Sequence, residues 1–233
     1  MSATLAESLV EAPRLSAPAE ARRRLTELLE TPSAVKLKPE LERGRTRDVL
    51  LGLADHSPYL WALVHEDPDR LVRLLRRPPD ESLGAVVQAL ASRRDEHEAD
   101  LMPALRRAKR ESALLIALAD IGGVWDVVEA TEALTRFADA AVRAALAFLL
   151  RKYARAGLLA LDADAPDPEK GSGVVVLALG KHGARELNYS SDVDLIVLYD
   201  SAAASIPPAR MGSKPALVIN AATTLPASSS SAA

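Results

Sequence analysis

Cysteine is absent from the 233 residues, and aromatic residues make up only 3% of them. The first absence excludes disulfide bonds and thiolate metal sites and is typical of a reducing compartment, so we expect the protein in the cytoplasm. The second absence predicts a core built mainly of Leu, Ala and Val. The formal net charge of −3 argues against nucleic acid as a partner.

Long apolar runs are also missing. No run approaches the roughly 20 residues that a membrane-spanning helix needs, and the N-terminus lacks the apolar core of a signal peptide, so no membrane partner is expected. The four histidines have no zinc-ligand spacing, and we expect them at surface or loop positions. They are His56, His65, His97 and His182.

Short basic clusters interrupt the near-neutral charge. We interpret them as solvated helix faces, with contact to an acidic partner or a nucleotide as the alternative. They are Arg22-Arg23-Arg24, Arg93-Arg94, Arg106-Arg107 and Lys109-Arg110.

The spacing of apolar residues divides the chain into five segments and predicts an α+β fold. Residues 1–45 are interpreted as a flexible lead with a short helix at 19–30, and residues 46–157 as a helical region. In this region Asp67 caps a helix, Gly122-Gly123 ends one, and Thr131-Glu132 starts a long one. A connector (158–173) leads to the first strands of a sheet (174–200), and the tail (201–233) is predicted to be disordered.

The most informative stretch lies between two apolar runs, residues 174–179 and 195–199, which are typical of buried strands. Its glycines, Gly180 and Gly183, would let backbone amides approach phosphate oxygens. Asp192 and Asp194, two residues apart on a strand, would point to one face and reach one Mg²⁺. This pattern indicates a metal-dependent nucleotidyltransferase. The alternative is two core strands joined by a polar loop without function.

Two other Asp-x-Asp patterns are interpreted as structural. Asp67-Pro68-Asp69 has the form of a helix start, with Pro68 at the first helical position. Asp162-Ala163-Asp164 lies in the Pro- and Asp-rich connector and lacks the Gly and Glu of a calcium loop.

The motif is similar to the signature of the glutamine synthetase adenylyltransferase/adenylyl-removing enzymes, which belong to the DNA polymerase β-like nucleotidyltransferase superfamily. The resemblance covers about residues 45–200, and His182 and Ala184 depart from the residues expected there. The residues that carry it are Gly180-Lys181-x-Gly183-x-x-Glu186-Leu187-Asn188-x-Ser190-Ser191-Asp192-x-Asp194-Leu195.

This resemblance implies the adenylyl-removing module, which uses phosphate to remove AMP from a tyrosine of glutamine synthetase and releases ADP; whole family members also add AMP from ATP. It implies Asp192 and Asp194 as catalytic metal ligands. It implies a phosphate-side turn made by Gly180, Lys181, Gly183, Ser190 and Ser191. Mg²⁺ and ATP or ADP are the implied cofactors. Glutamine synthetase and a small nitrogen-signalling protein are the implied partners.

The superfamily mechanism needs a third carboxylate on a later strand, and no Asp or Glu follows Asp200. We therefore expect a truncated gene, a frameshift or a fragment, and low or absent activity for this chain. Two alternatives remain: a nucleotidyltransferase of another branch acting on RNA or a small molecule, and a non-catalytic helical fragment that binds glutamine synthetase or a regulator.

Overall fold

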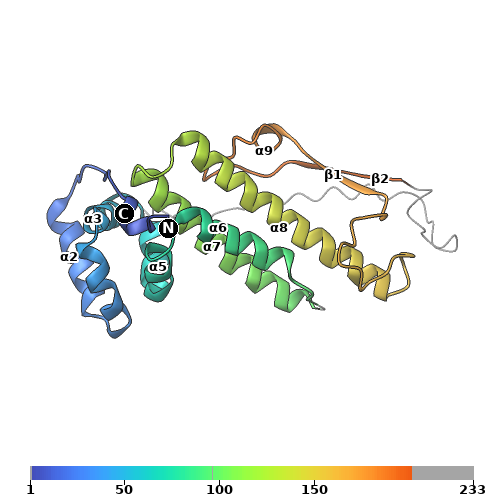
Figure 1. The fold of residues 1–233 in the computed structure, drawn as a ribbon, viewed down its shortest axis with the longest axis horizontal. Coiled ribbons are helices and arrows are strands. Elements are labelled where there is room, and N and C mark those ends of the chain that lie inside the picture. Colours follow the sequence, from blue (N-terminus) through green and yellow to red (C-terminus); the bar gives the residue numbers. More distant parts are fainter. Residues whose placement is uncertain (1, 96, 201–233) are drawn as a thin grey trace, which may run out of the picture. The chain divides into compact units, whose positions relative to one another are not determined.

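A computed structural model describes residues 2–95 and 97–200 of the chain. Twelve elements are described in this part, and they confirm a predominantly helical chain followed by a small sheet, an α+β fold (Figure 1). They are α1 (Leu5–Ser8), α2 (Pro18–Glu30), the 3₁₀ helix η1 (Pro32–Glu42), α3 (Thr46–His56), α4 (Pro58–Glu66), α5 (Pro68–Leu75), α6 (Pro79–Ala91), α7 (Glu98–Ile121), α8 (Val127–Arg155), β1 (Val174–Ala178), α9 (Gly180–Gly183) and β2 (Leu195–Tyr199).

The chain divides into two compact units at Ala144 and Ala145, within α8. The first unit contains an apolar core contributed by α1 to α7 and the start of α8. Leucines dominate this core, as the composition predicts, and each fully buried leucine contributes about 2 kcal/mol of transfer free energy. Its largest fully buried side chains are Leu5, Leu28, Leu37, Leu50, Leu53, Leu71, Leu74, Leu75, Leu83, Leu114, Leu115 and Ile116.

The first 45 residues differ from the flexible lead expected from the sequence. The predicted helix at 19–30 is present as α2, but α1 and η1 are also formed, and Leu5 and Leu37 are fully buried. Three long-range backbone hydrogen bonds hold this segment in place, and one of them joins the Glu11 N–H to the carbonyl of Gly122 at 3.0 Å. Leu5 N–H donates to the carbonyl of Arg77 at 2.9 Å, and Val10 N–H to that of Gly122 at 2.9 Å. These partners lie too far away in the chain for local patterns to reveal them.

Several helix boundaries follow local chemistry. Asp67 caps α5 as predicted, since its Oδ1 accepts the Arg70 N–H at 2.9 Å with Pro68 at the first helical position. Gly122 ends α7, also as predicted. The predicted start of α8 at Thr131 is wrong, because the helix begins at Val127 behind a cap at Asp126.

In the second unit, β1 and β2 form a two-stranded antiparallel sheet, with Val174 opposite Tyr199 and Ala178 opposite Leu195. The prediction that both strands are buried is wrong for the described residues. One face of the sheet is exposed, and its side chains are 42–52% accessible. They are Val175, Leu177, Ile196 and Leu198. The predicted disorder of residues 201–233 falls outside the described residues.

Candidate functional site

The two acids predicted to bind metal lie directly before β2. Asp194 is fixed through its backbone, because its carbonyl accepts the Leu179 N–H at 2.9 Å. This bond continues the sheet pairing one residue beyond Ala178 and Leu195. The end of β1 and the acid at the entry to β2 are therefore held side by side.

Asp192 and Asp194 are both exposed, and Val193 between them is half-buried. This alternation places the two carboxylates on one side of the chain, as their spacing predicts. Neither carboxylate group has a hydrogen bond or ion pair with another residue in the described ranges 2–95 and 97–200. Two unpaired carboxylates on one face repel each other, and a cation between them would offset that repulsion.

The turn between the strands is a single helical turn, α9, and two of its glycines are required by geometry. Gly180 has φ of +54°, and a Cβ there would lie 3.6 Å from Oδ2 of Asp194. At Gly183 a Cβ would lie 2.4 Å from the carbonyl oxygen of Ala178, far inside normal contact distance. The absence of both side chains keeps the turn tight and leaves space beside the Asp194 carboxylate.

Not every amide of this turn points outward. The Gly183 N–H donates to the carbonyl of Leu179 at 3.0 Å, and the Ala184 N–H to that of Gly180 at 3.0 Å. Lys181 is exposed. In this conformation the contribution of Gly183 to a phosphate site would be the space it leaves rather than its N–H.

Ser190 and Ser191 belong to a polar turn organised by Asn188. The Asn188 Oδ1 accepts the Ser190 N–H at 3.1 Å and the Ser191 hydroxyl at 2.9 Å. In return, the Ser191 Oγ accepts the Asn188 N–H at 3.0 Å. Asn188 was absent from the predicted site residues. Its signal in the sequence is the Asx turn formed when Asn precedes Ser by two residues.

His182 is buried at 3% exposure within the helical turn α9, so the prediction of a surface or loop position is wrong for this histidine. The other three histidines are exposed, as expected. Leu187 is also buried, at 4%. These two side chains anchor a segment whose other residues are nearly all exposed.

The donor set suits Mg²⁺ in chemistry and in number of ligands. Mg²⁺ is commonly held by one or two carboxylates, with waters and substrate phosphates completing its shell. Within the described residues, no group of three or more His, Asp or Glu side chains could hold a metal ion. Asp192 and Asp194 are the two acids that the sequence predicts as ligands, and they lie on one side of the chain.

Comparison with known proteins agrees with a nucleotidyl-transferring class. Residues 48–216 match the family model described as glutamate-ammonia ligase adenylyltransferase. The chain belongs to this family. The match continues 16 residues beyond Asp200, so the resemblance is longer than the one seen from the motif.

Curated relatives carry the name bifunctional glutamine synthetase adenylyltransferase/adenylyl-removing enzyme. One from Bradyrhizobium sp. (strain BTAi1) is 49% identical over 201 residues, 84% of this chain and 20% of the relative. One from Xanthobacter autotrophicus is 54% identical over 155 residues, 66% of this chain and 16% of the relative. The chain thus spans about a fifth of the length of the relatives it matches.

The described helices contain no segment that is both long and apolar enough to cross a bilayer.

Proposed function

We propose that residues 174–200 contribute the metal-binding edge of an adenylyl-removing module that acts on glutamine synthetase in the cytoplasm. The observation that carries this proposal is the placement of Asp192 and Asp194. Both are exposed on one side of the chain without a protein partner, next to a turn that Gly180 keeps open. The family membership and the printed names of the relatives support the substrate.

In this proposal Asp192 and Asp194 hold Mg²⁺, which would neutralise charge on the phosphates of ADP or ATP when bound. Lys181, Ser190 and Ser191 would bind phosphate oxygens from the two neighbouring turns. Asn188 would position both serines. A small nitrogen-signalling protein would be the regulatory partner.

Metal binding tests the site without requiring turnover. We expect the 233-residue chain to bind Mn²⁺, measured by electron paramagnetic resonance, and Mg²⁺ to displace it. Asp192→Asn and Asp194→Asn should each weaken binding about tenfold or more, because each removes one of two charged ligands. Asp162→Asn is the matched control, in one of the two other Asp-x-Asp patterns of the chain. Equal binding by all of these variants would refute the site.

Activity is tested by ADP release from adenylylated glutamine synthetase with phosphate and Mg²⁺. Only two carboxylates of the three that the superfamily mechanism requires are proposed, so we expect little or no release by this chain. Release that Asp192→Asn abolishes would overturn the expectation of low activity and support the site. Stoichiometric binding to glutamine synthetase with neither metal binding nor ADP release would favour the non-catalytic fragment instead.

A further inference from the structure

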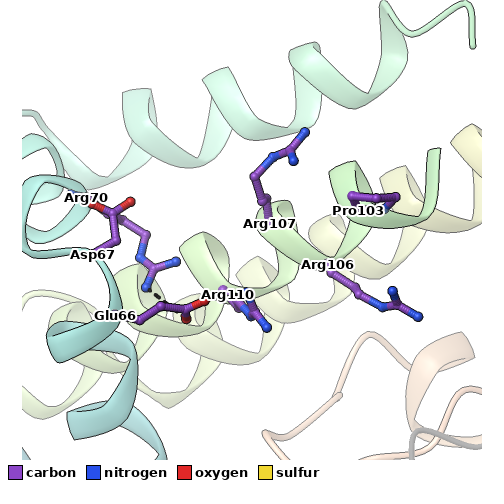
Figure 2. Close-up of a pocket in the computed structure, with 7 residues that line it drawn as sticks. All are labelled: Glu66, Asp67, Arg70, Pro103, Arg106, Arg107 and Arg110. Carbon is purple, nitrogen blue, oxygen red and sulfur yellow. Dashed lines mark hydrogen bonds and ion pairs between the residues drawn. The ribbon is translucent and has the colours of Figure 1, made fainter. Parts of the chain in front are cut away.

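A second polar site lies in the first unit, away from the Asp192–Asp194 motif in the chain. It is a hollow of about 470 Å³ between the start of α5 and the first half of α7 (Figure 2). This volume is within the range typical of small-molecule sites. The residues that line it are Glu66, Asp67, Arg70, Pro103, Arg106, Arg107 and Arg110.

The lining carries four guanidinium groups against two carboxylates, a net charge of +2. The carboxylates are already engaged. Glu66 Oε1 accepts from Arg110 at 2.6 Å, and its Oε2 lies 3.8 Å from Arg70. Asp67 caps α5 and lies 3.7 Å from Arg73, a residue outside the hollow. The excess positive charge therefore falls on Arg106 and Arg107.

Arg106 and Arg107 are exposed, and their side chains have no hydrogen bond or ion pair with any residue that the structure describes. Arg110 follows them on α7 at spacings of four and three residues, so the three guanidinium groups start from neighbouring positions on one helix. Like charges at such spacings destabilise a helix; Glu66 pairs with Arg110, and Glu111, four residues after Arg107, offsets part of the charge of Arg107, so the repulsion is least compensated at Arg106. A bound anion would remove the remaining repulsion.

Arg70 provides a second, independent indication. Arg70 is only 5% exposed, and its Nη2 donates to the carbonyl of Leu63 at 2.6 Å, so the side chain is held rigidly. Its Nε is buried without a hydrogen-bond partner in the described part of the chain. A buried donor without a partner costs free energy, and a ligand oxygen could satisfy it.

We propose that this hollow is a binding site for a phosphate-bearing small anion, distinct from the proposed metal site. A phosphate monoester carries about −1.5 to −2 charges near pH 7, which matches the excess charge of the lining. Guanidinium groups bind phosphate oxygens through paired N–H donors. Figure 2 shows the Arg106 and Arg107 side chains leaving α7 in different directions, so a change of rotamer in at least one of them would bring both against the anion, with Arg70 and Arg110 held in place by their existing contacts.

Isothermal titration calorimetry of the 233-residue chain at fixed ionic strength tests this proposal, with inorganic phosphate, AMP and acetate as ligands. We expect saturable binding of phosphate or AMP and much weaker binding of acetate. Tighter binding of AMP would identify a nucleotide phosphate as the ligand, and tighter binding of inorganic phosphate would identify the free ion. Equal heats from acetate would overturn the proposal.

Arg106→Gln and Arg107→Gln should each weaken binding about tenfold, and the double variant more, since each removes charge-assisted hydrogen bonds. Both side chains are exposed, so these variants should fold. Arg22→Gln removes an exposed arginine that does not line the hollow, and Asp192→Asn removes the proposed metal ligand; neither should change the affinity. Unchanged affinity in the double variant, or its loss in Asp192→Asn, would locate the anion elsewhere and refute this site.

Discussion

Arg76 donates a hydrogen bond from Nε to Oε1 of Glu40 at 2.7 Å, and the residue that accepts it is only 1% exposed. This contact joins η1 to the end of α5. Arg43 lies 3.5 Å from the other carboxylate oxygen, which has no hydrogen bond in the described chain. Arg76 is therefore the main partner of the buried Glu40 carboxylate.

We expect Arg76→Ala to lower the free energy of unfolding by about 2 kcal/mol, because it leaves a buried carboxylate without its hydrogen-bonded partner. Glu40→Gln should cost less, since the amide oxygen can still accept from Arg76. Urea denaturation measures both. Arg77→Ala, at the next exposed arginine, should change stability by less than about 0.5 kcal/mol. A similar loss in Arg77→Ala would mean that the Glu40 contact is not the cause.

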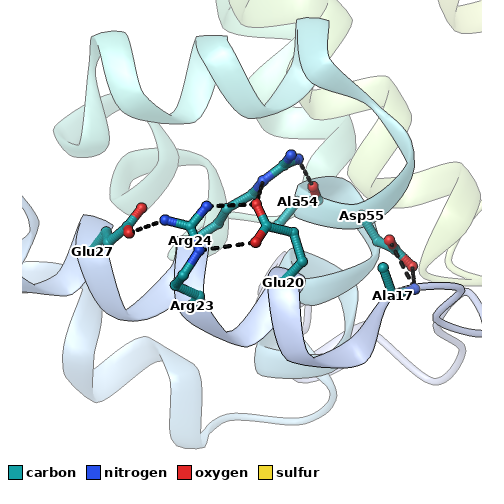
Figure 3. A network of polar contacts seen from close by, with 7 residues as sticks. All are labelled: Ala17, Glu20, Arg23, Arg24, Glu27, Ala54 and Asp55. Carbon is teal, nitrogen blue, oxygen red and sulfur yellow. Dashed lines mark hydrogen bonds and ion pairs between the residues drawn. The ribbon is translucent and has the colours of Figure 1, made fainter.

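At acidic pH, the free energy of unfolding should depend on the hydrogen-bond network around Glu20 (Figure 3). Hydrogen bonds from Arg23 and Arg24, at 2.9 and 2.8 Å, lower the pKa of Glu20 to about 2 from the usual 4.5. A carboxyl whose pKa is lower in the folded state contributes stability above its unfolded pKa and loses it as pH falls toward the folded value.

Accordingly, wild-type stability should fall more steeply than that of Glu20→Gln between about pH 5 and pH 2. Unfolding curves at several pH values measure the difference between the two proteins. Parallel stability profiles would show that Glu20 carries no pH dependence. Because the network is half exposed, added salt should reduce the difference.

The start of α8 depends on a reciprocal cap. Asp126 Oδ1 accepts the N–H groups of Val128 and Glu129, each at 2.8 Å, and Glu129 Oε2 accepts the Asp126 N–H at 2.9 Å. We expect Asp126→Ala to cost about 1–2 kcal/mol and Asp126→Asn much less, because asparagine can keep the cap. Thermal unfolding compares the two, and equal losses would exclude the cap as the cause.

Crowding at Gly183 gives a local prediction for the motif. Gly183→Ala would place a Cβ 2.4 Å from the Ala178 oxygen, so the turn must shift. We expect amide hydrogen exchange at Leu179 and Ala184 to accelerate about tenfold or more as the turn opens. Gly84→Ala is the control, because nothing lies within 4 Å of its Cβ and the helical site favours alanine. Unaltered exchange in Gly183→Ala would mean that the turn tolerates the methyl group.

Local chemistry explains which features could be predicted from the sequence. Asp67 and Pro68 fix the start of α5, and Gly122 ends α7. Each acts within a few residues of its own position, so a short stretch of sequence was enough to predict these helix ends. Two sequence patterns typical of a helix start lie near the beginning of α8. Asp126 and Glu129 form reciprocal capping hydrogen bonds, whereas the Thr131 hydroxyl donates to the Val128 carbonyl inside the helix, so α8 starts after Asp126 and not at Thr131.

Features that depend on distant partners could not be predicted. Leu5 is buried because α1 is fixed by the Arg77 carbonyl, and nothing near Leu5 in the sequence reveals it. The hollow lined by Arg106 and Arg107 appears only when α5 and α7 come together. The placement of Asp192 and Asp194 on one side of the chain could be predicted, because a spacing of two residues produces it in an extended chain.

The exposed face of β1 and β2 has a practical consequence for handling the protein. Val175, Leu177, Ile196 and Leu198 form a continuous apolar strip beside unpaired strand edges within the described chain. Such a strip is a surface for fluorescent hydrophobic dyes, for chaperones and for strand-to-strand self-association. Expression yield and colloidal behaviour of this chain should therefore depend on four aliphatic side chains that no helix in the described residues shields from water.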